Sequence, residues 1–277
     1  MASARRTLRV SKRNALFQEW LALKTNRQKR HRMGLFLVEG TTAIDSAVRH
    51  GWALDALLFP AGRPLSDWAE RHLATTPAER VVEIAPELLA ELTERNEGTE
   101  LLAIAHSRSI ELDALAPAEP WLGVVVDRPK SPGNLGSIVR TATSFDAAFL
   151  ITTGHAADPF DPACVRASVG TLFDLPLVLL PSHAPLLAWV EGQRVRRSLR
   201  VVGTGQAGSA LIDDVDLRGN VLLLLGNETE GLSSAYRGAC DVFARLPTGS
   251  RQPSLNVAAA AAILLYEARR QRGAGRG

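Results

Sequence analysis

The sequence predicts an α/β protein with a small N-terminal domain and a C-terminal domain built on a parallel sheet. Short apolar runs alternate with helical patterns along the 277 residues, as they do in α/β folds. The runs in the C-terminal half are continuously apolar, which strands covered on both faces require. Alanine and proline dominate residues 113–120, and this composition indicates a linker between the two domains.

Residues 1–34 predict a basic N-terminal extension. Arginine and lysine crowd positions 5–32, where Glu19 is the only acidic residue. Because the whole chain has a formal net charge of only +3, the remaining residues are net acidic and the positive charge is local. An apolar stripe over 16–23 at helical spacing indicates a helix within this extension. Such dense positive charge favours contacts with nucleic-acid phosphates.

Apolar runs and turn residues place the other elements. In the small domain, 35–112, strands are expected at 35–38, 54–59, 81–84 and 101–105, and helices at 43–48, 67–73 and 87–93. In the second domain, 121–272, strands are expected at 122–126, 149–152, 177–180, 200–203, 221–225 and 242–246. Its helices are expected at 135–145, 162–169, 185–191, 234–240 and 255–270, and residues 273–277 form a tail.

Composition excludes several classes of protein. The two cysteines, Cys164 and Cys240, are too few for a disulfide framework or a zinc site. The six histidines show no metal-binding spacing, so no metal is expected. No apolar run reaches the roughly 18 residues of a membrane span, and the basic N-terminus lacks the apolar core of a signal peptide. We therefore expect a cytoplasmic protein without a membrane partner.

The first of three informative turns is Pro132-Gly133-Asn134-Leu135-Gly136, which follows an apolar strand. Asn134 can cap the helix that begins here, and Gly136 leaves room for a close approach to the backbone. Arg140 falls on the same helical face as the two glycines. A plain helix cap with a surface ion pair is the alternative interpretation.

The second and third turns also follow apolar strands. Asn227 and Glu228 stand where a buried strand ends, a usual place for binding and catalysis in α/β proteins. Pro253-Ser254-Leu255-Asn256 begins the last helix, next to Arg251, and a helix N-terminus favours anions. A solvated loop is the alternative for the second turn. The alanines at 258–262 permit close helix packing or reflect helix propensity alone.

A glycine-rich stretch at 203–208 has a superficial likeness to a dinucleotide fingerprint. It follows a strand, yet the next residues predict no helix on which a pyrophosphate could sit. We therefore disfavour a nicotinamide site.

The three turns, in this order and separation, resemble the three motifs of the SpoU (TrmH-like) RNA methyltransferases of the trefoil-knot class. The resemblance covers 121 to about 271, and its most specific parts are Gly226-Asn227-Glu228 and Ser254-Leu255-Asn256-Val257. Residues 36–40 and the domain after them are similar to the ribosomal-protein-like RNA-binding domain of many members. The family usually has methionine after the proline of its third motif, where this chain has Thr248 after Pro247, and serine is common at the position of Ala258. These departures touch the cofactor pocket and the dimer helix.

The resemblance implies methyl transfer from S-adenosylmethionine to a ribose 2'-hydroxyl of structured RNA by a metal-free homodimer with a C-terminal trefoil knot. The implied catalytic residues are Asn134, Arg140, Glu228, Ser254 and Asn256. The expected cofactor-binding residues are Gly226, Leu246, Leu255, Asn227, Thr204 and Gly205. A guanidinium is a poor base, so we expect Arg140 to stabilise developing negative charge.

The RNA substrate and the biological role stay open at this point. The separate RNA-binding domain favours large-subunit ribosomal RNA over transfer RNA, in a housekeeping or an antibiotic-resistance role. Arg194, Arg196, Arg197 and Arg200 form a candidate second RNA-binding patch. A non-catalytic RNA-binding or ribosome-assembly protein of the same fold is the main rival, and a nicotinamide oxidoreductase is a third reading.

Overall fold

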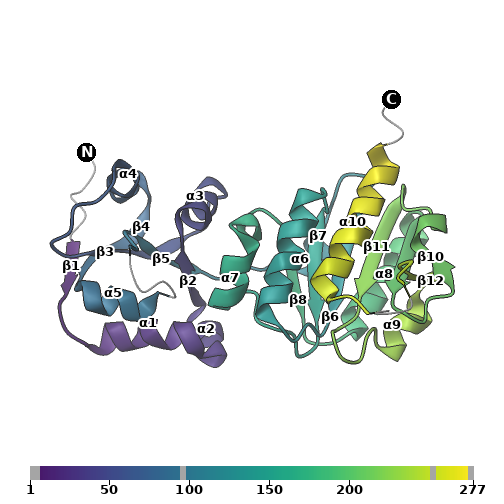
Figure 1. Cartoon of the computed structure of the whole chain (residues 1–277), viewed down its shortest axis with the longest axis horizontal. Coiled ribbons are helices and arrows are strands. Elements are labelled where there is room, and N and C mark those ends of the chain that lie inside the picture. The colour runs from purple at the N-terminus through teal and green to yellow at the C-terminus, as the bar shows by residue number, and fades with distance from the viewer. Residues whose placement is uncertain (1–6, 94–97, 250–253, 274–277) are drawn as a thin grey trace. The chain divides into compact units, whose positions relative to one another are not determined.

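The computed structural model describes residues 7–93, 98–249 and 254–273. The chain forms two compact units (Figure 1). Unit 1 consists of Met1–Ser107 together with Asp158–Asp174, and unit 2 of Arg108–Ala157 together with Leu175–Gly277. No helix in the described part of the chain is long and apolar enough to cross a membrane.

Unit 1 is built on a five-stranded sheet in the order β1-β4-β3-β5-β2. The strands β1, β4 and β3 are parallel to one another, and β5 runs antiparallel to both β3 and β2. The strands are β1 (Thr7–Val10), β2 (Leu35–Glu39), β3 (Leu54–Pro60), β4 (Ala78–Ile84) and β5 (Leu102–His106). The helices are α1 (Ala15–Thr25), α2 (Arg27–Met33), α3 (Thr41–Arg49), α4 (Asp67–Thr75) and α5 (Pro86–Leu92).

The basic N-terminal segment is built into unit 1. The strand β1, which no sequence pattern indicated, pairs with β4. The predicted helix is confirmed as α1, where the Asn14 side chain accepts a hydrogen bond from the Phe17 amide at 2.9 Å. One face of α1 buries Phe17, Trp20 and Leu23 in the hydrophobic core of the unit. Arg5 and Arg6 lie outside the described residues.

Unit 1 also takes part of its packing from residues 158–174, which follow β7 in the sequence. The buried Arg30 guanidinium donates to Asp158 at 2.7 Å and to Asp161 at 2.9 Å. Trp52 Nε1 donates to the Phe173 carbonyl at 2.9 Å. The segment contains α7 (Pro162–Ser168) and the 3₁₀ turn η2 (Thr171–Phe173). A stretch that sequence reasoning assigned to the second domain therefore helps to fold the first.

Unit 2 is built on a seven-stranded, fully parallel sheet in the order β10-β12-β9-β11-β6-β7-β8. The six strands predicted from the sequence are confirmed, and the short β10 was missed. The strands are β6 (Leu122–Asp127), β7 (Phe149–Thr153), β8 (Leu177–Leu180), β9 (Leu199–Thr204), β10 (Ala210–Leu211), β11 (Asn220–Leu225) and β12 (Val242–Arg245). The helices are α6 (Pro132–Ser144), α8 (Ala184–Arg196), α9 (Ser234–Ala239) and α10 (Val257–Gly273).

Helices cover the sheet of unit 2 (Figure 1). Residues of α8 and α9 join Phe149 and Trp121 in one apolar cluster, while α6 and α10 contact each other. The chain runs from β6 outward to β7 and β8, and then crosses β6 to form β9 and β11. Such a reversal brings the carboxyl ends of neighbouring strands together around a crevice, the usual ligand site in α/β sheets.

Candidate active site

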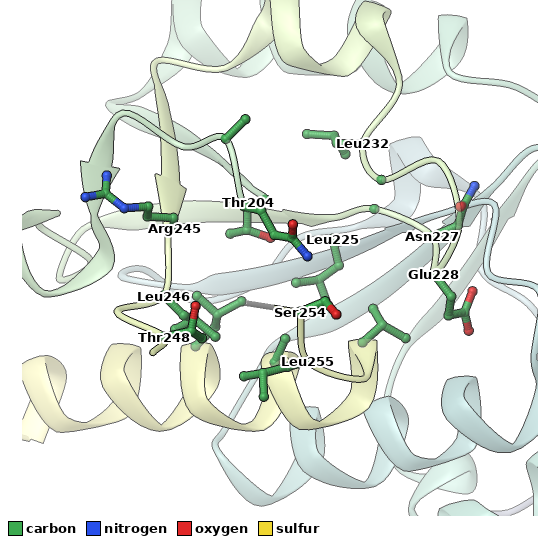
Figure 2. Close-up of a pocket in the computed structure, with 18 of the residues that line it drawn as sticks. Thr204, Leu225, Asn227, Glu228, Leu232, Arg245, Leu246, Thr248, Ser254 and Leu255 are labelled. Carbon is green, nitrogen blue, oxygen red and sulfur yellow. The ribbon is translucent and has the colours of Figure 1, made fainter. Parts of the chain in front are cut away.

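A cavity of about 1140 Å³ lies at the carboxyl ends of β9, β11 and β12. Its wall is formed by residues 204–207 after β9, 225–232 around the end of β11, and 245–249 and 254–257 between β12 and α10. Figure 2 shows Arg245 at one end of this cavity and Asn227 and Glu228 at the other. Pro253 and Arg251, which the sequence placed at this corner, lie outside the described residues.

The three predicted turns meet through a chain of side-chain hydrogen bonds. Asn134 Nδ2 donates to Glu228 Oε1 at 2.8 Å, and Asn256 Nδ2 donates to Asn134 Oδ1 at 3.2 Å. Each of these residues comes from a different turn, so the turns form one polar site. An ionised carboxylate can only accept hydrogen bonds, so Glu228 fixes the amide orientation of Asn134, and Asn134 in turn orients Asn256.

Glu228 is held in its charged form. Partial burial raises the pKa of this carboxyl, but hydrogen bonds from Asn134 and from backbone amides, including that of Lys130, lower it by more. The pKa of Glu228 therefore lies below its usual value. The site thus presents a carboxylate acceptor at neutral pH.

The loop that carries Glu228 is held by its own backbone and by Asn227. Asn227 Oδ1 accepts from the amides of Thr229 at 2.9 Å and Glu230 at 2.6 Å, and its backbone pairs with Gly231. A Cβ on Gly226 would lie 2.2 Å from the Gly231 carbonyl carbon, so only glycine fits there. The buried Asn227 Nδ2 has no hydrogen-bond partner within the described structure.

All six residues that the sequence assigned to the cofactor line this one cavity: Thr204, Gly205, Gly226, Asn227, Leu246 and Leu255. Three of the expected catalytic residues, Glu228, Ser254 and Asn256, line it too. Asn134 reaches it through its bond to Glu228. The glycine-rich stretch at 203–208 leads into β10 and a 3₁₀ turn, η3 (Ile212–Asp214), so it offers no α-helix N-terminus to a dinucleotide.

Arg140 is placed differently. It lies on α6 with an exposed side chain, and it is not one of the residues that line the cavity. The expected catalytic role of Arg140 therefore stays a prediction. Any role in catalysis requires a bound substrate or a second chain to reach it.

The predicted phosphate-binding arginines are also partly engaged elsewhere. Arg30 is buried, with 3% of its surface exposed, so the expected phosphate contact from this residue is wrong. In the second patch, Arg194 pairs with Asp241 at 2.7 Å, Arg197 with Glu119 at 2.8 Å and Arg200 with Asp216 at 3.8 Å. These acidic partners neutralise much of the patch.

Several residues of the site escaped sequence reasoning. Arg237, Arg245 and Gln206 line the cavity. Sequence reasoning singled out none of these side chains, although Gln206 lies in the glycine-rich stretch at 203–208. Asp127 and Arg128 were detectable in principle, because they directly follow a buried strand.

Comparison with known proteins identifies the family. Residues 122–266 match the SpoU rRNA methylase family, and residues 14–103 match the SpoU L30e-like domain. The chain belongs to the SpoU rRNA methylase family. The family predicted from the three turns is thereby confirmed, as is an α/β fold with a small N-terminal domain and a C-terminal parallel sheet.

The chain is similar to characterised relatives over nearly its full length. It is 46% identical to a 23S rRNA (uridine(2479)-2'-O)-methyltransferase of Streptomyces viridochromogenes, over 97% of this chain and 94% of the relative. The crystal structure of the SpoU methyltransferase AviRb from the same organism, in complex with AdoMet, matches with a TM-score of 0.89 and 46% identity, covering 94% of this chain and 98% of AviRb. An AdoMet-bound rRNA methyltransferase from Sinorhizobium meliloti matches at 30% identity and a TM-score of 0.84, covering 95% and 98%.

Proposed function

We propose that this SpoU family member transfers a methyl group from S-adenosylmethionine to a ribose 2'-hydroxyl of large-subunit ribosomal RNA. The observation that carries the proposal is the convergence of Asn134, Glu228 and Asn256 beside one cavity at the sheet edge. The relative that is 46% identical is named as a 23S rRNA 2'-O-methyltransferase. A tRNA-modifying enzyme from A. aeolicus matches only 57% of this chain, which favours ribosomal RNA as the substrate.

The cavity fits the cofactor in size and in chemistry. Its volume of about 1140 Å³ is ample for a ligand of this kind. Gly205, Gly226 and Asn227 belong to its wall, which combines polar and apolar groups. We assign cofactor binding to these residues together with Thr204, Leu246 and Leu255. When bound, S-adenosylmethionine supplies an electrophilic methyl group.

The residues of this chain align the ribose and stabilise its oxygen. Glu228 orders Asn134, and Asn256 with Ser254 stands at the start of α10, where backbone amides attract a phosphate of the RNA. Alignment of this kind can supply up to roughly 7 to 11 kcal/mol in ideal cases. A guanidinium is permanently charged, so Arg140 stabilises negative charge that develops on the ribose oxygen.

We further propose that the chain acts as a homodimer through unit 2. Arg140 lies outside the cavity of its own chain, and α10 exposes Ile263 and Tyr266, at 45% and 56% of their surface. Covering these side chains with a second copy would remove apolar surface from water, and we propose that the second copy then presents its Arg140 to the site. Analytical ultracentrifugation of the intact chain tests the oligomeric state.

Mixed dimers test whether the two chains share a site. Arg140→Ala and Glu228→Gln chains are each expected to keep only a small residual turnover alone, about a hundredth of wild type. Random exchange makes half of the dimers mixed, each with one complete site of two, so about a quarter of wild-type turnover should return if Arg140 serves the partner's cavity. No recovery would assign Arg140 to its own chain.

We also propose the trefoil knot that membership of this family implies. The support is the match of residues 122–266 to the family model. A knotted chain pulled from its two ends tightens and stops short of its full length. Force spectroscopy that reaches about 3.3 to 3.6 Å for every residue would contradict the knot.

Incubating the protein with ribosomal RNA and tritiated S-adenosylmethionine tests the reaction. Primer extension at limiting nucleotide then maps the modified position. Arg140→Ala should lose roughly a hundredfold or more in turnover while it still binds the cofactor in calorimetry, with exposed Arg218→Ala as a control of equal charge. Cofactor binding without methyl transfer would favour the non-catalytic RNA-binding protein.

The cellular role follows from the mapped nucleotide. We place the reaction in the cytoplasm, where ribosomal RNA is modified. Unit 1 is assigned to RNA binding, because its sequence matches the L30e-like domain of the family. Expression in a sensitive host, followed by growth on ribosome-targeting antibiotics, separates an antibiotic-resistance role from a housekeeping one.

A further inference from the structure

A buried carboxylate lies beneath the loop that carries Glu228. Asp127 is the last residue of β6 and only 3% exposed. It accepts hydrogen bonds from the Ser233 amide at 2.9 Å and from Thr153 Oγ1 at 3.3 Å. Asp127 also accepts two bonds from Arg128, from Nε at 3.1 Å and from Nη2 at 3.2 Å. This carboxylate therefore joins β6, β7 and the residue before α9, and it binds the Arg128 guanidinium in a bidentate pair.

Arg128 occupies an unusual backbone conformation. Its φ is +51°, in the left-handed region that residues with a side chain seldom adopt. Such a conformation persists only where the surroundings enforce it, and it is found most often at functional sites. The Arg128 amide donates to the Thr153 carbonyl at 3.0 Å. The side chain then crosses Gly154, where a Cβ would lie 2.8 Å from Arg128 Cγ. The stem and the head of this arginine are thus both fixed.

The free end of the guanidinium meets the loop that carries Glu228. Arg128 Nη1 donates to Glu230 Oε2 at 2.5 Å. Glu230 lies two residues after Glu228, and Glu228 Oε2 accepts from the Lys130 amide at 3.3 Å. The loop is therefore fastened to the segment 127–134 by two carboxylates, one on Glu228 and one on Glu230.

We propose that Arg128 and Glu230 are positioning residues, which set the loop so that Glu228 holds Asn134 in place for methyl transfer. This role rests on the proposed function. Arg128 is not among the residues that line the cavity, so it acts through Glu230 rather than on a ligand. An exposed ion pair contributes little to stability by itself. Stability alone therefore does not explain why Arg128 has a strained backbone and is held by the buried carboxylate of Asp127. Positioning of Glu228 does explain both features.

The test compares Arg128→Met, Glu230→Gln and the double variant in the full chain. Turnover at saturating RNA should fall roughly ten- to a hundredfold in each single variant, because small misplacements of an aligning group are costly. The double variant should be no slower than the worse single one, since both changes break the same contact. Cofactor affinity by calorimetry should stay near wild type, as should the melting temperature of Glu230→Gln, whereas Arg128→Met should melt lower because buried Asp127 loses its cation.

Background and control variants separate positioning from other roles. In a Glu228→Gln chain, adding Arg128→Met should cost nothing further, because the group to be positioned has already been altered. Glu191→Gln is the matched control: Glu191 is also exposed and pairs with an arginine, Arg194, at 2.9 Å, but it does not line the cavity. This control should keep full turnover.

Three results would overturn the positioning role of Arg128 and Glu230. Wild-type turnover in Glu230→Gln would overturn the positioning role, as would additive losses in the double variant or a further loss in the Glu228→Gln background. If Arg128→Met fails to fold, the turnover of Glu230→Gln still tests the positioning role. Glu230→Asp keeps the carboxylate, so it should retain more turnover than Glu230→Gln. Absence of methyl transfer by the unaltered chain would instead overturn the proposed function itself.

Discussion

Replacing Arg30 by methionine should destabilise unit 1 strongly. The guanidinium donates to Asp158, to Asp161 and, through Nη1, to the Leu23 carbonyl at 2.8 Å. Asp158 keeps only 2% of its side chain exposed. Methionine would leave this carboxylate buried without its cation, with the Phe160 amide as a remaining donor at 3.0 Å. Breaking a buried ion pair from one side costs about 3–5 kcal/mol of unfolding free energy.

Urea unfolding followed by circular dichroism measures this loss. Arg32→Met is the matched control, because Arg32 lies two residues away with an exposed side chain, and its stability should stay within about 0.5 kcal/mol of wild type. Adding Asp158→Asn and Asp161→Asn to Arg30→Met should recover part of the loss, since no buried charge then remains unpaired. A stability of Arg30→Met equal to that of the control, combined with a reduced salt dependence of RNA binding, would refute the buried ion pair and restore the phosphate contact inferred from the sequence.

Two further predictions concern the cavity. Gly226→Ala should abolish cofactor binding measured by calorimetry, because its Cβ would lie 2.2 Å from the backbone at Gly231, whereas Gly219→Ala, which meets open space, should bind normally. Equal affinity in the two variants would contradict the close backbone contact between Gly226 and Gly231. The pKa of Glu228 is lowered in the folded state, so its contribution to stability is fully present above the usual carboxyl pKa and is lost as pH falls through the lowered value. The free energies of unfolding of wild type and Glu228→Gln, measured at intervals from about pH 7 to about pH 3, should therefore converge at the acid end. A constant difference between the two free energies would count against the charged carboxylate.

Most elements of the fold were predictable because their signals are local. Strands such as 122–126 are continuous apolar runs, and Ser131 with Pro132 marks the start of α6. The missed strands, β1 and β10, are short and lie at the sheet edges, where pairing rather than sequence pattern defines them. Nothing local indicated that residues 158–174 join unit 1, since that depends on Arg30, which is 128 residues away from Asp158 in the sequence.

The candidate site likewise has features that the sequence predicted and features that depend on residues far apart in the sequence. The rule that parallel strands end at one edge sufficed to bring Glu228 towards Asn134. The pairing of Arg128 with Glu230 joins positions 102 residues apart; Glu230 lies in the second turn, but Arg128 lies in no motif, so no pattern indicated the pair. The arginines at 194–200 were misleading because a run of charged residues shows how dense the positive charge is but not which acidic residues pair with it. Arg194, for example, pairs with Asp241, which lies far along the chain.

The placement of Arg140 constrains how the site can work. Asn134, Glu228 and Asn256 are tied to one another within one chain, so their geometry exists before any ligand arrives. Arg140 is exposed on α6 and outside that chain of hydrogen bonds. Preorganised groups stabilise a transition state most when they need no rearrangement, so a second copy that presents its own Arg140 would complete the site more effectively than a movement of α6. A rigid orienting set and a charge supplied by the partner would couple turnover to dimer formation, which makes turnover per chain fall on dilution below the dimer dissociation constant.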